Sequence, residues 1–202
     1  MDHLINVLLI DEQKRKEAMD NSFHNFHAKG LDYICLFRSE EYTVKIYILD
    51  GDASKLPEVV NPHDHRYTFR TTVLSGSMID HHLVRGGSKG LVYNAFDYLT
   101  PLNGGNGFTF RGEERITKIG SLILFPGDKL ESAGNKIHTI QMQSDQTIIK
   151  LEQFADHIPL DIPTSTWFST DTKTVSLDGL YDKFTEESFI QRLHTIKGAS
   201  HV

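Results

Sequence analysis

Residues 61–69 read Asn-Pro-His-Asp-His-Arg-Tyr-Thr-Phe, which places His63 and His65 two positions apart at the start of an apolar run. Side chains alternate between the two faces of a β-strand, so these two imidazoles share one face. Neutral imidazole is the commonest protein ligand of transition metals. The pair predicts half of a metal site; the alternative is a polar strand end whose rings are hydrogen-bonded in the loop after Pro62.

The composition of the whole chain is that of an ordinary globular protein. Its 202 residues are 39% hydrophobic and 24% charged, which is enough for a sizeable core and favours one domain over residues 1–202. The formal net charge of −6 and the scattered Lys and Arg residues argue against a nucleic-acid partner. The single Cys35 excludes an internal disulfide. No apolar run is long enough to cross a membrane and no secretory signal is evident, so a cytoplasmic protein is expected.

The middle of the chain reads as short strands separated by turn residues. Residues 31–37 and 42–49 are rich in Ile, Val, Tyr and Leu, and a turn-forming segment divides them. The second of these alternates between an apolar and a polar set of residues: Val44, Ile46 and Ile48 against Thr43, Lys45 and Tyr47. Further strands are predicted at 67–74, 77–84, 91–99, 107–110, 115–119, 121–125, 136–142 and 147–154. Many short strands without helices between them predict a β-sandwich or barrel.

Helical patterns lie at both ends of the chain. Asp11 is a suitable N-cap for a helix over residues 11–29, with an apolar stripe of Met19, Phe23 and Phe26 and a stop at Gly30. Near the other end, Thr185 caps a helix that finishes at Gly198 and has its own apolar stripe, formed by Phe189, Leu193 and Ile196. The predicted organisation is a helical segment over 1–30, a barrel over 31–157 and an extension over 158–202, in which Trp167 and Phe168 anchor a polar, irregular stretch.

A second informative stretch supplies a third histidine. Residues 127–138 read as a turn, a short strand, a tight turn and the start of another strand. His138 falls on the same strand face as Ile140 and Met142, which is the face expected to point into the barrel. His138 is therefore predicted to be an inward-facing histidine on a barrel strand.

Together these stretches resemble the two motifs of the cupin superfamily, the small jelly-roll β-barrels that hold one metal ion. The first motif has two histidines, usually a glutamate and a closing glycine; here Phe69 stands at the glutamate position and Gly76 at the glycine. In the second motif Gly127 and His138 keep the family spacing, while Met142 replaces the final asparagine. The resemblance covers roughly residues 40–155.

The resemblance implies a mainly β, cupin-type jelly-roll barrel, to which the patterns at the two ends of the chain add an N-terminal and a C-terminal helix. It implies that His63, His65 and His138 bind Fe(II) or another divalent metal without a carboxylate ligand. Three-histidine cupins include thiol and diketone-cleaving dioxygenases, so the implied function is a mononuclear non-heme Fe(II) oxygenase, with dioxygenase the favoured type. Its partners would be O2 and a small chelating anionic substrate, and a homodimer is a further expectation because cupin barrels often pair through edge strands.

Other candidate residues are assigned by strand face and by charge. Tyr67 shares a face with His65 and is, with His82, a candidate catalytic group; Tyr47 and Tyr93 are alternative bases. The candidate substrate-binding residues are Phe69, Arg70, Met142 and Lys150, and the further cations considered are Arg85, Arg111 and Arg115. Two other functions stay open: a non-redox metal-dependent lyase or isomerase, and a ligand-binding cupin without catalysis.

Overall fold

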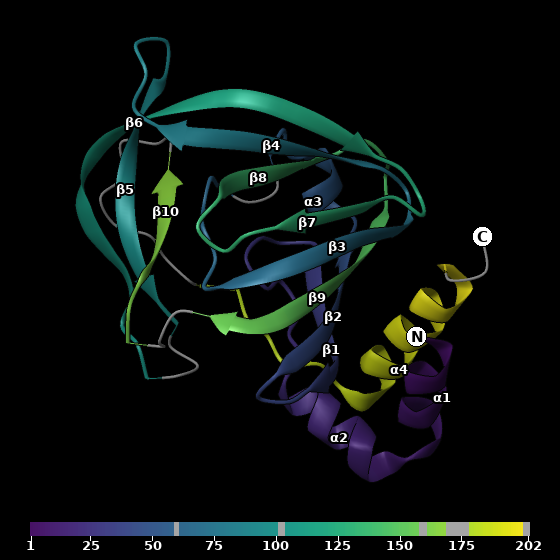
Figure 1. Ribbon diagram of the computed structural model, residues 1–202. Coiled ribbons are helices and arrows are strands. Elements are labelled where there is room, and N and C mark those ends of the chain that lie inside the picture. Colours follow the sequence, from purple (N-terminus) through teal and green to yellow (C-terminus); the bar gives the residue numbers. More distant parts are fainter. Residues whose placement is uncertain (59–60, 101–103, 158–160, 169–177, 200–202) are drawn as a thin grey trace.

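The computed structural model describes residues 1–58, 61–100, 104–157, 161–168 and 178–199, and these form two antiparallel sheets that curl toward each other (Figure 1). The first sheet has the order β1-β2-β9-β3-β7. Its strands are β1 (Leu31–Arg38), β2 (Tyr42–Leu49), β9 (Thr147–His157), β3 (Tyr67–Ser75) and β7 (Lys129–Ser132). The second sheet has the order β10-β5-β6-β4-β8. Its strands are β10 (Thr164–Phe168), β5 (Leu91–Leu99), β6 (Gly107–Leu124), β4 (Met78–Arg85) and β8 (Ile137–Met142). The predicted fold class, a mainly β protein of jelly-roll type with helices at both ends, is confirmed.

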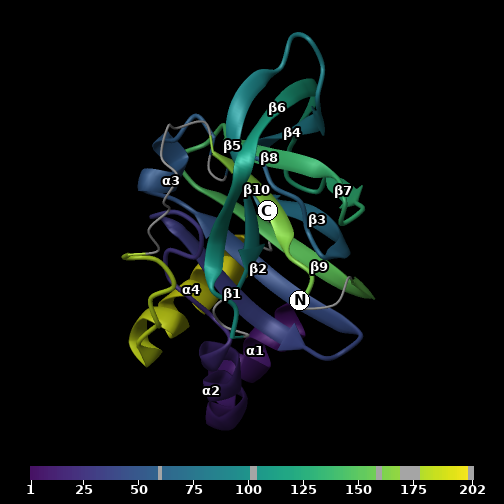
Figure 2. The same cartoon turned by 90° about the vertical axis from the view of Figure 1, so that its left-hand side faces the viewer.

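Three of the helices cover the outer face of the first sheet. These three are α1 (Asp2–Ile10), α2 (Glu12–Asp20) and α4 (Glu186–Ala199). A fourth, short helix, α3 (Asp52–Lys55), follows β2. Figure 2 shows α1, α2 and α4 gathered on the side of β1 and β2. The core between them joins Ile34, Ile46 and Ile48 of the sheet to residues of α1 and α4 such as Ile5 and Phe189, all fully buried. The predicted stripe of α4 is confirmed, since Phe189, Leu193 and Ile196 belong to this core.

The alternation predicted for residues 42–49 has a structural consequence. The apolar set packs under the helices on the outer face, so the polar set of Thr43, Lys45 and Tyr47 is turned into the space between the two sheets. The inner face of this sheet is thus partly polar and borders a cavity, whereas a purely structural sandwich would bury apolar residues there.

The helix predicted over residues 11–29 is wrong in its second half. Asp11 caps α2 as predicted, its side chain accepting a hydrogen bond from the Lys14 amide, but the helix ends at Asp20. Phe23 instead forms a β-bridge with Tyr33, because the aromatic side chains that follow α2 pack onto β1. Gly30 (φ +82°) stands not at a helix end but in the turn into β1, where an added Cβ would lie 2.3 Å from the Asp50 carbonyl oxygen. The first helix, α1, was not predicted.

Two strand predictions also differ from the structure. The three strands predicted between residues 107 and 125 are one strand, β6, whose two halves pair with β5 and β4. Residues 164–168, predicted to be irregular, form β10 on the edge of β5. Trp167 in this strand is fully buried, so its predicted anchoring role is confirmed. Pairing with a distant strand, not local sequence, decides both cases.

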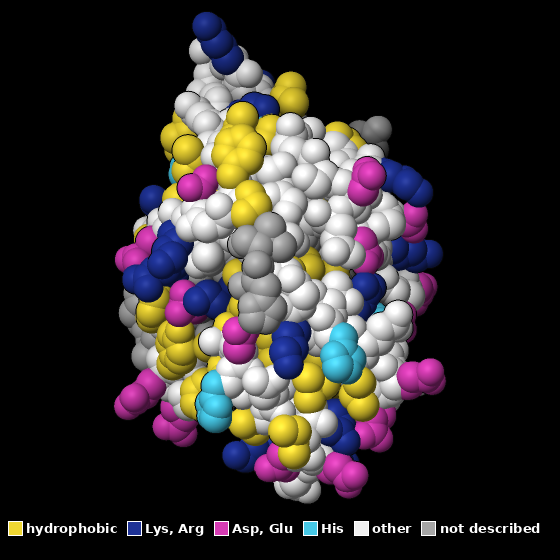
Figure 3. Space-filling view, turned by 90° about the vertical axis from the view of Figure 1, so that its right-hand side faces the viewer, with side chains coloured by type: hydrophobic (Ala, Val, Ile, Leu, Met, Phe, Trp, Pro, Cys, Tyr) yellow, Lys and Arg dark blue, Asp and Glu magenta, His cyan; other side chains and the backbone are white. Residues whose placement is uncertain are grey.

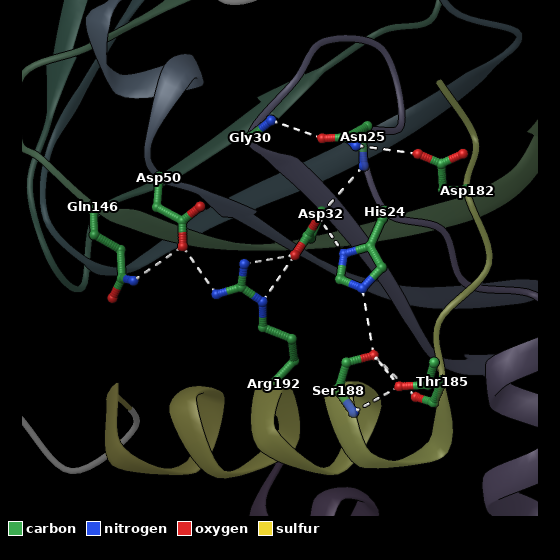
Figure 4. Close-up of polar contacts among 10 residues, drawn as sticks. All are labelled: His24, Asn25, Gly30, Asp32, Asp50, Gln146, Asp182, Thr185, Ser188 and Arg192. Carbon is green, nitrogen blue, oxygen red and sulfur yellow. Dashed lines mark hydrogen bonds and ion pairs between the residues drawn. The ribbon is translucent and has the colours of Figure 1, made fainter. Parts of the chain in front are cut away.

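An ion-pair network around the buried Asp32 ties α4 to the first sheet, as Figure 4 shows. Arg192 donates from Nε and Nη2 to Oδ2 of Asp32, both at 2.8 Å, and from Nη1 to Oδ2 of Asp50 at 2.9 Å. His24 Nδ1 lies 2.9 Å from the other oxygen of Asp32. Asp32 is only 3% exposed, so these partners supply the compensation that a buried carboxylate needs.

The surface shows no concentration of one charge on the face drawn in Figure 3, where among the described residues basic and acidic side chains are interspersed. Of the helices in the described ranges, none is both long enough and apolar enough to span a lipid bilayer.

Candidate metal centre

Backbone hydrogen bonds hold the His63–His65 segment against the second sheet. The amide of His63 donates to the carbonyl of His138, and the amide of His138 donates back to the carbonyl of His63, both at 3.0 Å. The amide of His65 donates to the carbonyl of Gly134 at 2.7 Å, and Trp167 donates to the carbonyl of Pro62 at 2.8 Å. A segment just before β3 is thereby placed beside β8 and β10.

The three histidines predicted from the sequence converge at this point. One ligand nitrogen from each of His63, His65 and His138 lies within 4.8 Å of the other two. Nε2 of His65 and Nε2 of His138 are 2.9 Å apart. Zinc and similar divalent ions bind imidazole nitrogen at about 2.0–2.1 Å, so ligand atoms of one ion lie about 3 Å apart. The arrangement fits a single ion held by three imidazoles.

Hydrogen bonds at the other ring nitrogens orient two of the ligands. Nδ1 of His138 lies 2.8 Å from Oδ2 of Asp80, and Nδ1 of His63 lies 2.8 Å from the carbonyl oxygen of Asn61. Both partners are acceptors, so the ring protons sit on Nδ1 and the Nε2 lone pairs are free to bind an ion. Asp80 is 2% exposed and completes a carboxylate–histidine pair of the kind that raises ligand basicity at metal sites.

The electrostatics of the cluster keep the imidazoles of His63 and His65 neutral. Desolvation in the cavity wall, with the neighbouring His138, holds the pKa of His63 well below its usual range. Desolvation also lowers the pKa of His65, and the nearby His63 adds to this effect. A metal competes with protons for imidazole, so lowered pKa values favour metal binding at neutral pH.

Phe69 occupies the position at which the cupin motif usually has glutamate. Its side chain is 2% exposed, and its ring centroid lies 4.5 Å from that of His65 and 5.6 Å from that of His138. An apolar ring therefore packs against two of the histidines at this position, and it offers no ligand atom. The carboxylate of Asp80 approaches His138 on the side of its Nδ1 atom, away from the other two histidines of the cluster.

The centre opens into a cavity of about 780 Å3 between the sheets. His63, His65 and Tyr67 contribute to its wall, as do the inward-facing side chains of β2. The aromatic part of the wall consists of Phe23, Phe26, Tyr33, Tyr47, Tyr98, Phe108, Phe168 and Tyr181. The volume and the mixed lining suit a small organic molecule with both apolar and polar groups.

The other predicted site residues lie at different distances from the cavity. Tyr67 lines it, and its ring centroid is 5.6 Å from that of His65. His82 pairs in register with His138, and its Nε2 lies 2.8 Å from Oδ1 of Asp80 without hydrogen-bond alignment, so it belongs behind the histidine cluster. The neighbouring His81 is buried on the opposite face, with Ser121 and Gln141 as partners.

The predicted substrate-binding residues are more scattered. Arg70 pairs with Glu131 and Lys150 with Glu152, and neither cation is among the described residues that line the cavity. Met142 is buried in an apolar cluster with residues of β3 and β4. Of the further cations, Arg111 pairs with Asp97 and Glu114.

Sequence reasoning missed two residues that the structure places at the site. Asp80 precedes the candidate His82 by two positions, so the two side chains share one face of the strand. This polar pair in an apolar strand could have indicated that Asp80 belongs to the site. Lys45 is 6% exposed and lines the cavity. Its place in the polar set of β2 could have indicated that it faces the cavity.

Comparisons with known proteins yield structural matches only. No protein-family model and no curated protein sequence matches the chain. Among solved structures, it is similar to hydroxypropylphosphonic acid epoxidase from S. wedmorenis, with 10% identity, a TM-score of 0.41 and coverage of 67% of this chain and 56% of that one. It is also similar to a cupin superfamily protein from Desulfitobacterium hafniense DCB-2 (14% identity, 62% and 78% coverage, TM-score 0.36). A third match is the DMSP lyase DddQ from Ruegeria pomeroyi DSS-3 (11% identity, 63% and 48% coverage, TM-score 0.38). The alignment spans little more than half the length of the epoxidase.

Proposed function

We propose that this chain is a metal-dependent enzyme in which His63, His65 and His138 hold one divalent ion, and that the ion is Fe(II) in an oxygenase, of the dioxygenase type. The observation that carries the proposal is the orientation of the rings: Nδ1 of His63 and of His138 each face an acceptor, which leaves Nε2 of both rings for the ion. A three-histidine site offers no negative charge, so a small anionic chelating substrate would balance the ion.

Each side chain has a separate part in this proposal. The three imidazoles bind the ion, and Asp80 orients His138 through its Nδ1 proton. Phe69 keeps water from the back of His65, while the cavity bordered by Tyr67 admits the substrate. A bound ferrous ion supplies sites for substrate and O2 side by side and a path for electrons between them.

The first experiment measures metal content and oxygen uptake together. Protein reconstituted anaerobically with Fe(II) is supplied with thiols, diketonates and 2-oxo acids in an oxygen-electrode cell. His138→Ala is expected to lose both the metal and the oxygen uptake. The matched control is His194→Ala, an exposed histidine of α4 that should retain both. Full metal occupancy in His138→Ala would refute the three-histidine site.

A second candidate is a non-redox lyase or isomerase that uses the metal as a Lewis acid. It is favoured by the position of Tyr67, which lines the cavity beside His65 and offers a hydroxyl for proton transfer. Turnover with Zn(II) and without oxygen consumption would select this function over the oxygenase. Absence of metal in purified protein that still binds a small molecule would select the third alternative, a binding protein without catalysis.

The remaining expectations belong to the same proposal. The chain acts as one domain over residues 1–202, as a homodimer in the cytoplasm, on a small molecule and not on nucleic acid. Light scattering coupled to size-exclusion chromatography measures the oligomeric state, and a monomeric mass would refute the dimer.

A further inference from the structure

Lys45 is a buried cation on the cavity wall. Its side chain comes from the inner face of β2 and is only 6% exposed. Nζ donates a hydrogen bond to the Tyr67 hydroxyl at 2.9 Å and lies over the rings of Tyr67 and Tyr33, at 4.6 and 5.6 Å from their centroids. In the described part of the chain no carboxylate pairs with it. Burying an ammonium group with only neutral partners destabilises the fold. An anionic ligand in the cavity would supply the negative charge that compensates it.

A second cation stands in the same wall with the same kind of partner. Nη2 of Arg38 donates to the Tyr33 hydroxyl at 2.8 Å, and Nη1 donates to Oδ1 of Asn21 at 3.1 Å. Both of these acceptors are uncharged. Both cations line the cavity and donate to a phenol hydroxyl, and neither pairs with a carboxylate among the described residues. Lys45 is buried, whereas Arg38 stands at the exposed end of β1.

The two phenols are left with protons to donate. Tyr67 accepts from Lys45 and Tyr33 accepts from Arg38, so each hydroxyl oxygen is used as an acceptor and keeps its own hydrogen for donation. The Tyr33 hydroxyl also has the Cys35 thiol beside it as a weak partner, which a charged oxygen would replace. Burial raises the pKa of Tyr33, which keeps this phenol protonated. Two cations and two hydroxyl donors on one wall are the groups that bind a carboxylate or phosphate oxygen.

We propose that Lys45, Tyr67, Tyr33 and Arg38 form an oxyanion-binding subsite of the cavity, which takes the carboxylate or phosphate-type group of the substrate. The subsite adjoins the metal centre through Tyr67, whose ring neighbours that of His65. The substrate class is then a small molecule with a metal-binding end and a separate acidic group. This assignment rests on the proposed function, because that proposal makes the cavity the substrate site of a metal centre. Anion binding itself can be measured without a metal.

The test is calorimetric titration of the full-length chain in EDTA, where no anion can bind to a metal ion. The probes are inorganic phosphate, acetate and the neutral acetamide. Wild type should bind at least one of the two oxyanions, and Lys45→Met should weaken that binding about ten-fold or more, the value of one lost charge-assisted hydrogen bond. The control Lys129→Met makes the same change of charge on the exposed β7 and should bind as wild type does. Preference for acetate or for phosphate identifies which acidic group the substrate carries.

A second variant and a stability measurement guard against misfolding. Tyr33→Phe removes one hydroxyl and keeps the ring, and several-fold weaker oxyanion binding is expected. Lys45→Met should raise the melting temperature of the ligand-free protein, because it removes an uncompensated buried charge. No oxyanion binding to wild type, or equal binding to Lys45→Met, would overturn the subsite.

Metal content separates this proposal from the one on which it rests. Lys45→Met should take up as much Fe(II) as wild type, because Lys45 is not among the clustered histidines. If wild type binds the oxyanion, Lys45→Met loses that binding and neither protein takes up metal, the subsite stands and the oxygenase is refuted. If Lys45→Met binds metal normally and binds the anion as wild type does, the metal site stands and the subsite is refuted.

Discussion

Asp80 and His138 lie on neighbouring strands, and Oδ2 of the aspartate is 2.8 Å from Nδ1 of the histidine. The carboxylate is almost fully buried, and its second oxygen lies 2.8 Å from Nε2 of His82. The aspartate thus lies between two histidines of the second sheet and is hydrogen-bonded to His138, the one that belongs to the histidine cluster. This relationship makes the strand pair β4–β8 part of the proposed metal centre.

The first prediction concerns Asp80. Asp80→Asn keeps an oxygen that can accept from Nδ1 of His138 but removes the charge that makes this imidazole a stronger ligand. We expect metal affinity to fall about 10–100-fold, measured by competition with a chromophoric chelator. Asp145→Asn, in an exposed loop, makes the same change of charge and should leave the affinity unchanged. Equal affinities for the two variants would contradict the role of Asp80.

The second prediction places a carboxylate where the cupin motif usually has one. Phe69→Glu puts an acidic group at a position that is 2% exposed, so urea unfolding of the metal-free protein should show a loss of several kcal/mol. Added divalent metal should restore more stability to this variant than to wild type, because the new carboxylate can coordinate it.

Phe69→Leu is the control for lost packing at this site. It keeps an apolar side chain and should cost about 1–2 kcal/mol, with the same gain from metal as in wild type. If Phe69→Glu gained no more from metal than Phe69→Leu, position 69 would lie outside coordination range.

The third prediction concerns pH. The lowered pKa values of His63 and His65 mean that both rings stay neutral in the folded metal-free protein at pH values where the unfolded chain binds protons. Below about pH 6.5, protonation therefore stabilises the unfolded state relative to the folded state. Each histidine lowers the free energy of unfolding by up to about 1.4 kcal/mol for every pH unit. Between pH 7 and pH 5 the free energy of unfolding should fall.

A double variant isolates the contribution of these two rings. His63→Gln with His65→Gln removes both titrating groups, so its stability should fall less steeply over the same pH interval. The measurement is urea unfolding in EDTA at several pH values. Parallel pH profiles for wild type and the double variant would show that other groups cause the loss.

The fourth prediction concerns the network that anchors α4. Arg192→Leu leaves the buried Asp32 with His24 and the Asn25 amide as partners but without its cation. The free energy of unfolding should fall by about 2–3 kcal/mol, less than for a fully buried pair because Arg192 is partly exposed. Adding Asp32→Asn should recover part of the loss. The exposed pair of Arg111 and Asp97 is the comparison, and Arg111→Leu should cost about 1 kcal/mol or less.

The sequence by itself determined the features that depend on local pattern. Alternation along residues 42–49 predicted a strand with two different faces. The resemblance of the stretches around His63, His65 and His138 to the two cupin motifs predicted that the three rings meet at one metal ion. The caps at Asp11 and Thr185 are confirmed by hydrogen bonds to the amides of Lys14 and Ser188. These features are readable because side-chain direction repeats every two residues in a strand and because capping uses groups only three residues apart.

Only the tertiary structure decided which faces and which distant residues meet. The apolar face of β2 packs under the helices, which sends Lys45 into the cavity and leaves its charge beside Tyr67 and Tyr33. Strand pairing brings Asp80 to His138 across 58 positions of sequence. Pairing with β4 and β5 likewise makes residues 107–124 one strand, and β10 pairs with the edge of β5. Inter-strand hydrogen bonds form between segments far apart in the chain, so their register is set by the assembled core and not by local sequence.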